Sequence, residues 1–357
     1  MKLLVIIPGK FAGCGFYRLY QPHNHLAKNY DVDITFASGF MKTEISAFTD
    51  DELKEFSAII WHKTLFDFKD IRRARGLGIP TVADFDDHWV VGRDHSLYKE
   101  YQSEGQHGRL HKLLLSVDYV TCTTEDLADE IYKHNQQVEV LPNAYDLGYG
   151  GWKEGRIEED KYVFGYLGGP CHVRDVGMLR GVRDATGAHF RLFGYNGTDI
   201  YKHYAKVLSG DGGNFSLYKG ADIWHYPQFY NYMDVSLVPL EANKFNSMKS
   251  ELKMVEAGAF KKAVIVSNVK PYTNVITDKN CIAVNSKNEW IDAIKLLMND
   301  PQRGIDMGLQ LHEDTKRYDI ENVNKLRYKF YKYVQQKHNT DSGDEPGRVV
   351  HFDKLAV

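Results

Sequence analysis

Short apolar runs alternate with longer amphipathic segments along the first 145 residues. The apolar runs have the length of strands, and the segments between them carry apolar residues at the three- and four-residue spacing of helices. Strands that alternate with helices are typical of a parallel sheet covered on both faces. We predict strands at 2–8, 32–38, 57–63, 79–85, 118–124 and 138–142, and helices at 18–28, 51–56, 70–77, 109–117 and 124–135.

The stretch that follows is rich in glycine and polar residues and has no periodicity, which indicates a linker. The same alternation then resumes in the second half of the chain. Strands are predicted at 162–168, 189–195, 214–220, 234–240, 263–268 and 281–285, and helices at 289–298, 305–317 and 322–337.

The 357 residues are too many for one ordinary compact core and suit two. Because both halves show the same pattern, the predicted fold class is α/β, with two Rossmann-like domains whose parallel sheets face a central cleft. The predicted division is an N-terminal domain at 1–145, a linker at 146–160, a C-terminal domain at 161–320, a helix at 321–337 that packs back on the N-terminal domain, and a polar tail at 338–357.

Composition argues against several classes of protein. The chain is 43% hydrophobic and 26% charged with a net charge of −3, which gives no general attraction to nucleic acid or anionic lipid. Its four cysteines form no C-x-x-C pair, so neither a disulfide framework nor a zinc site is predicted. The first apolar run is too short for a signal peptide, and no segment approaches the roughly 20 apolar residues of a membrane span. We expect a cytoplasmic protein whose membrane contact, if any, is peripheral.

Ligands of open α/β sheets bind beyond the carboxyl ends of the strands, so candidate residues are sought there. Gly9, Gly13 and Gly15 follow the first strand and precede a helix, whose N-terminus favours an anion. The loop does not match the G-x-G-x-x-G fingerprint of dinucleotide sites, and a plain turn is the alternative. Arg18, one turn into the helix, could direct a guanidinium at the cleft.

The fourth strand ends in three carboxylates and a histidine, in the stretch DFDDHW. Such a cluster could hold a divalent metal, could supply catalytic or acceptor-binding groups to the cleft, or could be a solvated turn. Because the chain has two predicted domains, we favour cleft-facing catalytic residues and expect no metal. The residues concerned are Asp86, Asp87 and His88.

Two loops of the second half carry further candidates. Gly168 and Gly169 end the strand at 162–168, and His172 and Arg174 stand where a helix should begin, so amides and cations could converge on a diphosphate. A glycine loop with a solvated arginine is the alternative. Tyr195 follows the next strand and could contact a base or sugar, although a simple surface loop would explain it as well.

The stretch FNSMKSELKMVEAG lies between two predicted strands and has a charged stripe. If a helix begins near Ser247, steps of 100° per residue place Lys253 and Glu256 within about 40° of Lys249. The lysines and neighbouring Ser250 would suit a phosphate, and the glutamate would suit neighbouring hydroxyls of a sugar or ribose. A solvated helix face is the alternative.

Together, these motifs and their order resemble the retaining glycosyltransferases of the GT-B fold, and in particular glycosyltransferase family 4 (glycosyl transferases group 1). The segments that carry the resemblance span most of residues 1–275. They are GCGFYRLYQPHNHL, DFDDHW, VEVLPNAYD, FGYLGGPCHVRDV and MDVSLVPLEANKFNSMKSELKMVEAGAFKKAVIVSNVKPY.

The resemblance implies a metal-independent hexosyl- or pentosyltransferase without a separate cofactor. Its substrate would be a nucleoside-diphosphate sugar, UDP- or GDP-linked, and its acceptor a glycan or a lipid-linked sugar. By position, Arg174, Lys249 and Lys253 would face the diphosphate or sugar and Glu256 the donor ribose. Gly13 and Gly15 would lie near the donor phosphates, and His88 near the reacting carbon and acceptor.

The sequence departs from the family's pattern at two places. Met248 stands where the family usually has the first glutamate of its pair, so the identity of the donor sugar is open. The arginine expected after the strand at 162–168 is also missing, with Tyr166 and Leu167 in its place.

Three alternative functions remain from the sequence. A phage-type DNA glycosyltransferase acting on hydroxymethylated bases would need a basic groove, for which 69–78 and 108–112 supply cations, although a solvated helix face is the simpler explanation. A non-catalytic nucleotide-sugar binding protein and a sugar-nucleotide epimerase of the same fold are the others.

Overall fold

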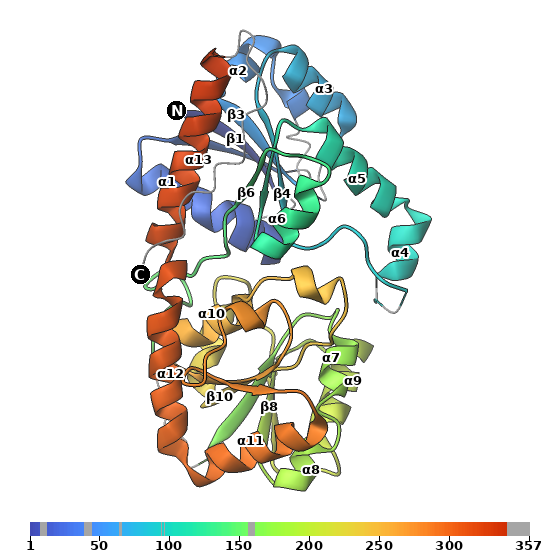
Figure 1. The fold of residues 1–357 in the computed structure, drawn as a ribbon, viewed down its shortest axis with the longest axis vertical. Coiled ribbons are helices and arrows are strands. Elements are labelled where there is room, and N and C mark those ends of the chain that lie inside the picture. Colours follow the sequence, from blue (N-terminus) through green and yellow to red (C-terminus); the bar gives the residue numbers. More distant parts are fainter. Residues whose placement is uncertain are drawn as a thin grey trace.

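The computed structural model describes residues 1–7, 13–38, 45–63, 66–93, 95, 97–155 and 161–340. Gly9, the end of the predicted linker and residues 341–357 of the predicted tail lie outside the described residues. Within them, the chain forms two six-stranded parallel sheets with helices on their faces, which confirms the predicted fold class (Figure 1). All twelve predicted strands are present.

The first sheet has the strand order β2-β1-β3-β4-β5-β6. Alternate side chains of β1 enter different cores, as the pleat of a strand requires. Leu4 and Ile6 pack with helices α2, α3, α5 and α6, whereas Leu3 and Val5 pack with α1 and α13. The strands are β1 (Lys2–Ile7), β2 (Asp33–Ser38), β3 (Ala58–His62), β4 (Thr81–Phe85), β5 (Tyr119–Cys122) and β6 (Val138–Val140). The helices named are α1 (Gln21–Asn29), α2 (Asp50–Lys54), α3 (Phe68–Gly76), α5 (Gln106–Ser116), α6 (Glu125–Tyr132) and α13 (Ile320–Thr340).

The second sheet has the strand order β12-β11-β10-β7-β8-β9. Its strands are apolar on both faces, as expected for a parallel sheet covered by helices. The strands are β7 (Val163–Leu167), β8 (His189–Tyr195), β9 (Phe215–Lys219), β10 (Val235–Val238), β11 (Ala263–Ser267) and β12 (Ile282–Val284). The helices are α7 (Val173–Gly177), α8 (Val182–Thr186), α9 (Asp199–Ser209), α10 (Leu252–Ala259), α11 (Lys287–Asn299) and α12 (Pro301–Thr315).

Two features join the halves of the molecule. Helix α13 lies along the first sheet, where Phe330, Tyr331 and Val334 enter its core (Figure 1). The π-helical turn η1 (Gly15–Tyr20) sends Phe16 and Tyr17 into a core cluster of the second half. No helix among the described residues combines the length and apolarity needed to cross a bilayer.

Local signals explain some helix boundaries but not others. Thr124 caps α6 by accepting a hydrogen bond from the amide of Leu127, as its position before two acidic residues predicts. The helix expected from Ser247 is different, because a 3-10 turn (Asn246–Met248) is followed by extended backbone at Lys249, with φ −70° and ψ 166°. Helix α10 begins only at Leu252.

Candidate active site in the interdomain cleft

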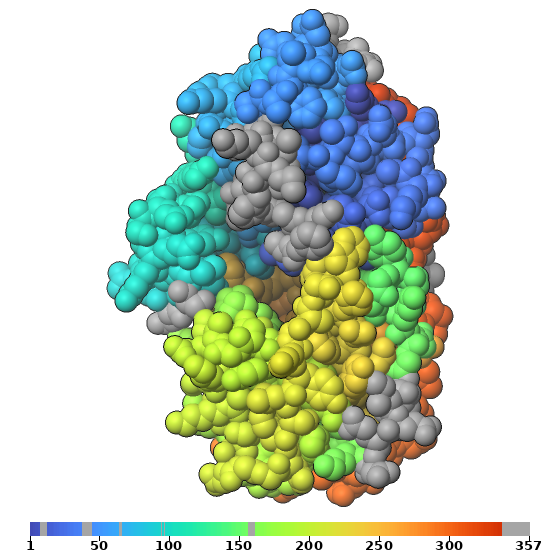
Figure 2. Space-filling view, turned by 180° about the vertical axis from the view of Figure 1, so that it is seen from behind, coloured from blue at the N-terminus to red at the C-terminus, as the bar shows by residue number. Residues whose placement is uncertain are grey.

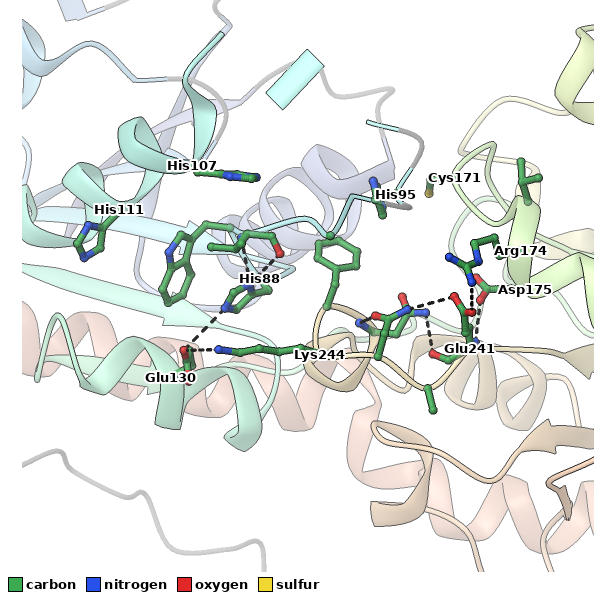
Figure 3. Close-up of a pocket in the computed structure, with 18 of the residues that line it drawn as sticks. His88, His95, His107, His111, Glu130, Cys171, Arg174, Asp175, Glu241 and Lys244 are labelled. Carbon is green, nitrogen blue, oxygen red and sulfur yellow. Dashed lines mark hydrogen bonds and ion pairs between the residues drawn. The ribbon is translucent and has the colours of Figure 1, made fainter. Parts of the chain in front are cut away.

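A cavity of about 1010 Å³ opens between the two domains. Its walls come from α5, α6 and the loops that follow β4, β7 and β10, so the carboxyl ends of strands in both sheets border it. Figure 2 shows the hollow between the domains from behind. In Figure 3, His88, His107 and His111 lie on the first-domain wall, and Arg174 and Glu241 lie on the second-domain wall.

Beside this cavity, the predicted residues Asp86 and Asp87 each form an ion pair with a lysine. Asp86 Oδ1 lies 2.5 Å from Lys63 Nζ, and Asp87 Oδ1 lies 3.5 Å from Lys249 Nζ across the cleft. Burial favours the neutral acid, but Lys63 and His62 hold the pKa of Asp86 well below its usual range. Burial likewise disfavours the charged lysine, yet Asp87 raises the pKa of Lys249. Asp86 and Lys249 therefore keep their charges at neutral pH.

The loop after β7 brings a second set of charges to the cleft. His172 Nδ1 lies 2.7 Å from Asp175 Oδ2, and Asp175 Oδ1 accepts a 2.7 Å hydrogen bond from the Glu241 amide. Burial opposes the imidazolium, but the bond to Asp175 raises the pKa of His172. Arg174 pairs with Glu241 at 2.7 Å and is half exposed.

The two glycines of this loop are held by tyrosines of α9. The Gly168 carbonyl accepts a hydrogen bond from Tyr201 and the Gly169 carbonyl accepts one from Tyr204, at 2.9 and 3.0 Å. Because N–H and C=O point in opposite directions across a trans peptide, the Gly169 amide points away from α9. A Cβ at Gly168 would lie 2.4 Å from the Tyr166 hydroxyl oxygen, so a larger residue there would force a movement.

Comparison with known proteins identifies the fold that surrounds this cleft. No family model and no curated protein matches the sequence. Solved structures do match over 93% of the chain. One is sucrose-phosphate synthase from Thermosynechococcus elongatus, with a TM-score of 0.67 and 13% identity over 98% of that chain. Another is Anabaena HepE in complex with UDP-glucose, with a TM-score of 0.65 and 13% identity over 100% of that chain. A glycosyltransferase from Rickettsia africae matches with a TM-score of 0.65 and 10% identity, over 98% of its length.

The fold is GT-B. At these identities the likeness shows the fold alone, and this fold places the predicted loops after β4, β7 and β10 around one interdomain cleft.

Glu256 lies deeper than predicted. Its side chain is fully buried, and Oε2 accepts hydrogen bonds from Tyr230 at 2.8 Å, Lys253 at 3.1 Å and Tyr226 at 3.4 Å. Lys253 also contacts the Tyr226 hydroxyl. The predicted stripe is therefore wrong in one respect. Lys253 and Glu256 share a face of α10, but Lys249 precedes that helix and reaches Asp87 instead.

The expectation that Arg18 directs its guanidinium at the cleft is also wrong. Arg18 is 1% exposed, and its guanidinium forms two hydrogen bonds with Asp84, at 3.0 and 2.8 Å. It also donates to the Leu141 carbonyl and to Asn143 Oδ1. Asn143 in turn donates to Ser250 Oγ at 2.8 Å, so Ser250 lies at the domain junction. The arginine supports the fold rather than a ligand.

The remaining predicted residues are Gly13, Gly15 and Tyr195. Gly13 is exposed with no atom near its Cβ direction, and Gly15 is buried at the start of η1. Tyr195 ends β8 and packs partly against the core of the second domain. None of these positions has a described contact with the charged residues at the centre of the cleft.

The first-domain wall contains a group of histidines that the sequence analysis missed, apart from His88. The others come from three separate segments, so only the fold brings them together: His95, His107, His111 and His134. Burial lowers the pKa of His88, His95, His107 and His134, which favours their neutral forms. Glu130 and Lys244, which pair at 3.0 Å across the cleft, were also missed.

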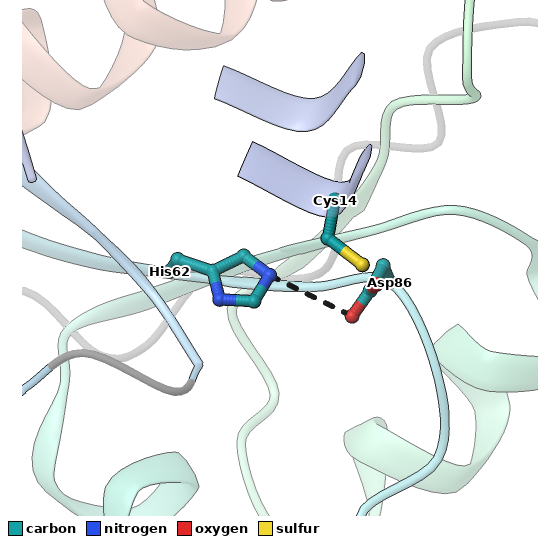
Figure 4. A group of neighbouring side chains, drawn as sticks. All are labelled: Cys14, His62 and Asp86. Atoms are coloured by element: carbon teal, nitrogen blue, oxygen red, sulfur yellow. Dashed lines mark ion pairs between the residues drawn. The ribbon is translucent and has the colours of Figure 1, made fainter. Parts of the chain in front are cut away.

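Cys14, His62 and Asp86 place their ligand atoms within 4.8 Å of one another, which is the kind of cluster that can hold a metal (Figure 4). Their chemistry fits one poorly. The Asp86 carboxylate is already bound to Lys63, and desolvation, together with the charge of Asp86, raises the pKa of the Cys14 thiol. A protonated thiol is a weak metal ligand. These side chains are therefore better explained by the internal ion pair of Asp86 with Lys63 than by a metal centre.

Proposed function

We propose that the protein is a glycosyltransferase that moves a sugar from a nucleoside-diphosphate sugar to an acceptor hydroxyl, with retention at the anomeric carbon. The observation that carries the proposal is the ion pair of Lys249 with Asp87, which joins the two Rossmann-like domains beside the cavity between them. The Lys63–Asp86 and His172–Asp175 pairs lie in the same charged region. Cations and the Gly169 amide of the second domain suit a diphosphate, and the first-domain wall offers groups for a hydroxyl.

The proposed donor site lies on the second domain. Negative charge develops on the leaving diphosphate, and fixed cations that meet it there lower the barrier. Lys249, the His172 imidazolium and the Gly169 amide are the groups that would supply this stabilisation. The leaving phosphate can itself accept the acceptor's proton, so retention needs no separate nucleophile. UDP is the favoured nucleotide because HepE, a structure with the same fold, holds UDP-glucose.

The proposed acceptor site lies on the first-domain wall. His88 is 3% exposed, and its Nε2 has no hydrogen-bond partner among the described residues. The nearest carboxylate oxygen, Glu130 Oε1, is 3.9 Å away, too far for a direct hydrogen bond. A hydroxyl oxygen about 2.8 Å from both atoms would bridge them. The acceptor we propose is a glycan or a lipid-linked sugar, which offers such hydroxyls.

The structure favours this acceptor over DNA. Arg73 pairs with Asp50, and Arg75 pairs with Asp118. Arg109 donates to the Phe66 carbonyl and lies over its ring. These arginines, which the DNA hypothesis needs for phosphates, are engaged within their own domain.

The donor is tested by thermal unfolding with a panel of nucleotides. We expect UDP at a hundred times its dissociation constant to stabilise the fold by about 2.7 kcal/mol and so to raise Tm, since the ligand binds only the folded state. Uridine, which lacks the diphosphate, should raise Tm much less at the same concentration. A panel in which UDP, GDP and ADP all leave Tm unchanged would contradict a donor site.

A further inference from the structure

His172 and Asp175 form a pair one turn apart at the start of α7. The Asp175 side chain is only 6% exposed, whereas that of His172 is 21% exposed. Both carboxylate oxygens of Asp175 are occupied, one by His172 Nδ1 and the other by the Glu241 amide, each at 2.7 Å. Each carboxylate oxygen of Asp175 thus has a partner within the protein, and its bond to His172 lets it influence a ligand through that ring.

Residues that follow three strands fix the position of His172. Asp175 is tied to the loop after β10 through Glu241, and the His172 amide donates to the Tyr204 hydroxyl of α9 at 3.0 Å. The imidazole is therefore held by residues that follow β7, β8 and β10. A hydrogen bond to a carboxylate also selects which ring nitrogen carries a proton, and leaves the other nitrogen for a further partner.

Charged and titratable groups reach His172 from every side. Asp175 and Arg174 lie on its own helix, the Cys171 thiol precedes it, and Glu241 lies beside Asp175. Lys249 opposes its protonation, and His95 approaches from the first domain. Burial and Lys249 lower the pKa of His172, but the hydrogen bond to Asp175, followed by the interactions with the Cys171 thiol, raises it above the usual value.

We propose that Asp175 is a positioning residue that holds His172 as an imidazolium beside Lys249, where it donates a hydrogen bond to the diphosphate of the bound nucleotide. This inference rests on the proposed function and goes beyond it, because it gives nucleotide binding a dependence on pH. The ligand class is a nucleoside diphosphate. Asp175 itself does not touch it.

The sign of the effect follows from the charge. The imidazolium favours the diphosphate, so affinity is full below the pKa of His172 and falls as pH rises through it. Replacing Asp175 by asparagine removes the negative partner and lowers that pKa, so the fall moves to lower pH. If binding requires the charged ring, each unit by which the pKa of His172 falls weakens nucleotide binding by about tenfold at a pH above both pKa values.

Two measurements test the inference. The first follows the His172 imidazole by NMR between pH 5 and 9, assigned by its loss in His172→Gln, in the free wild-type protein and in Asp175→Asn. The second measures the Kd of UDP over the same range for both proteins. The matched control is Asp222→Asn, because Asp222 and His225 form the same pair of residue types at 2.8 Å on the exposed surface. Taking the ratio of variant to wild type cancels the titration of UDP itself.

We expect Asp175→Asn to lower the pKa of His172 and to weaken UDP binding at pH values above the lowered pKa, by about tenfold for each unit of the decrease, with wild-type affinity recovered at low pH. Asp222→Asn should match the wild type throughout, and His172→Gln should bind UDP weakly without the histidine-dependent step. A pKa of His172 that Asp175→Asn leaves unchanged would overturn the positioning role.

An equal pH profile for UDP binding in the wild type and His172→Gln would show that the ring does not face the diphosphate, and would overturn this inference while leaving the proposed function intact. If the wild type binds none of UDP, GDP and ADP, both fail together. If Asp175→Asn does not fold, the comparison of wild type with His172→Gln still decides whether the imidazolium contributes.

Discussion

Replacing Lys249 by alanine should lower kcat/KM for sugar transfer by about 10²- to 10³-fold, the range seen when one fixed donor to a developing negative charge is removed. The Lys249 ammonium reaches across the cleft, 3.5 Å from Asp87 Oδ1, and lies 4.8 Å from the centre of the Phe245 ring. Its loss would remove one of the two partly buried cations proposed to stabilise the leaving diphosphate, the other being His172. Steady-state kinetics with a saturating acceptor would measure the effect.

Two further variants make the Lys249 result specific. Lys249→Arg keeps the charge and should retain more activity than Lys249→Ala. Lys316→Ala removes a lysine from an exposed pair with Glu313 and should leave kcat/KM unchanged. Turnover by Lys249→Ala within a factor of about three of the wild type would contradict the proposed role of this lysine in electrostatic stabilisation.

Replacing Arg18 by alanine should reduce the free energy of unfolding by about 3–5 kcal/mol, because it leaves the buried Asp84 carboxylate without its cation. Asp84 accepts two hydrogen bonds from Arg18 and one from Thr121, and is 2% exposed. Urea unfolding would measure the loss. Few single substitutions in the chain should cost as much.

The control for Arg18 is an exposed pair in the same domain. Lys54→Ala breaks the pair with Asp51 at the surface and should change the stability by less than about 1 kcal/mol. Adding Asp84→Asn to Arg18→Ala should recover part of the stability, since the uncompensated charge is gone. If Arg18→Ala is as stable as the wild type but loses affinity for UDP, the arginine binds the ligand and the structural role assigned here is wrong.

The strands were predictable because each is a short apolar run bounded by polar residues, and a parallel sheet buries both faces of such runs. Helix α9 was predictable but missed. Its apolar residues at 200, 201, 204, 207 and 208 have the spacing of one helix face, and two of its tyrosines hold the glycine loop.

The course of the chain around Lys249 could not be predicted from spacing. The pattern of charges fits a helix from Ser247, but the backbone becomes extended at Lys249, and the ion pair with Asp87 forms across 162 residues of sequence. The burial of Arg18 depends in the same way on Asp84 of β4, a residue 66 positions away. Such contacts are set by the packing of domains and strands, which local periodicity does not contain.

The rule that ligands bind beyond the carboxyl ends of strands selected loops that border the cavity, but not all the residues that line it. Of the residues it selected, His88 lines the cavity, and Asp86, Asp87 and His172 are sequence neighbours of residues that line it. It missed Glu130 and the histidines of α5, because these lie on helices and reach the cavity through the orientation of those helices.

The central claim, that the cleft holds a nucleotide sugar and transfers its sugar, is tested most directly by the release of nucleoside diphosphate. The wild-type protein and Lys249→Ala would each be incubated with a panel of UDP- and GDP-sugars, with and without glycan acceptors, and the released diphosphate measured. We predict that the wild type releases diphosphate from one donor faster with an acceptor than without, and that Lys249→Ala does so at least about a hundredfold more slowly. Binding of UDP without release from any donor would contradict catalysis, and conversion of a donor to its epimer without release would contradict transfer.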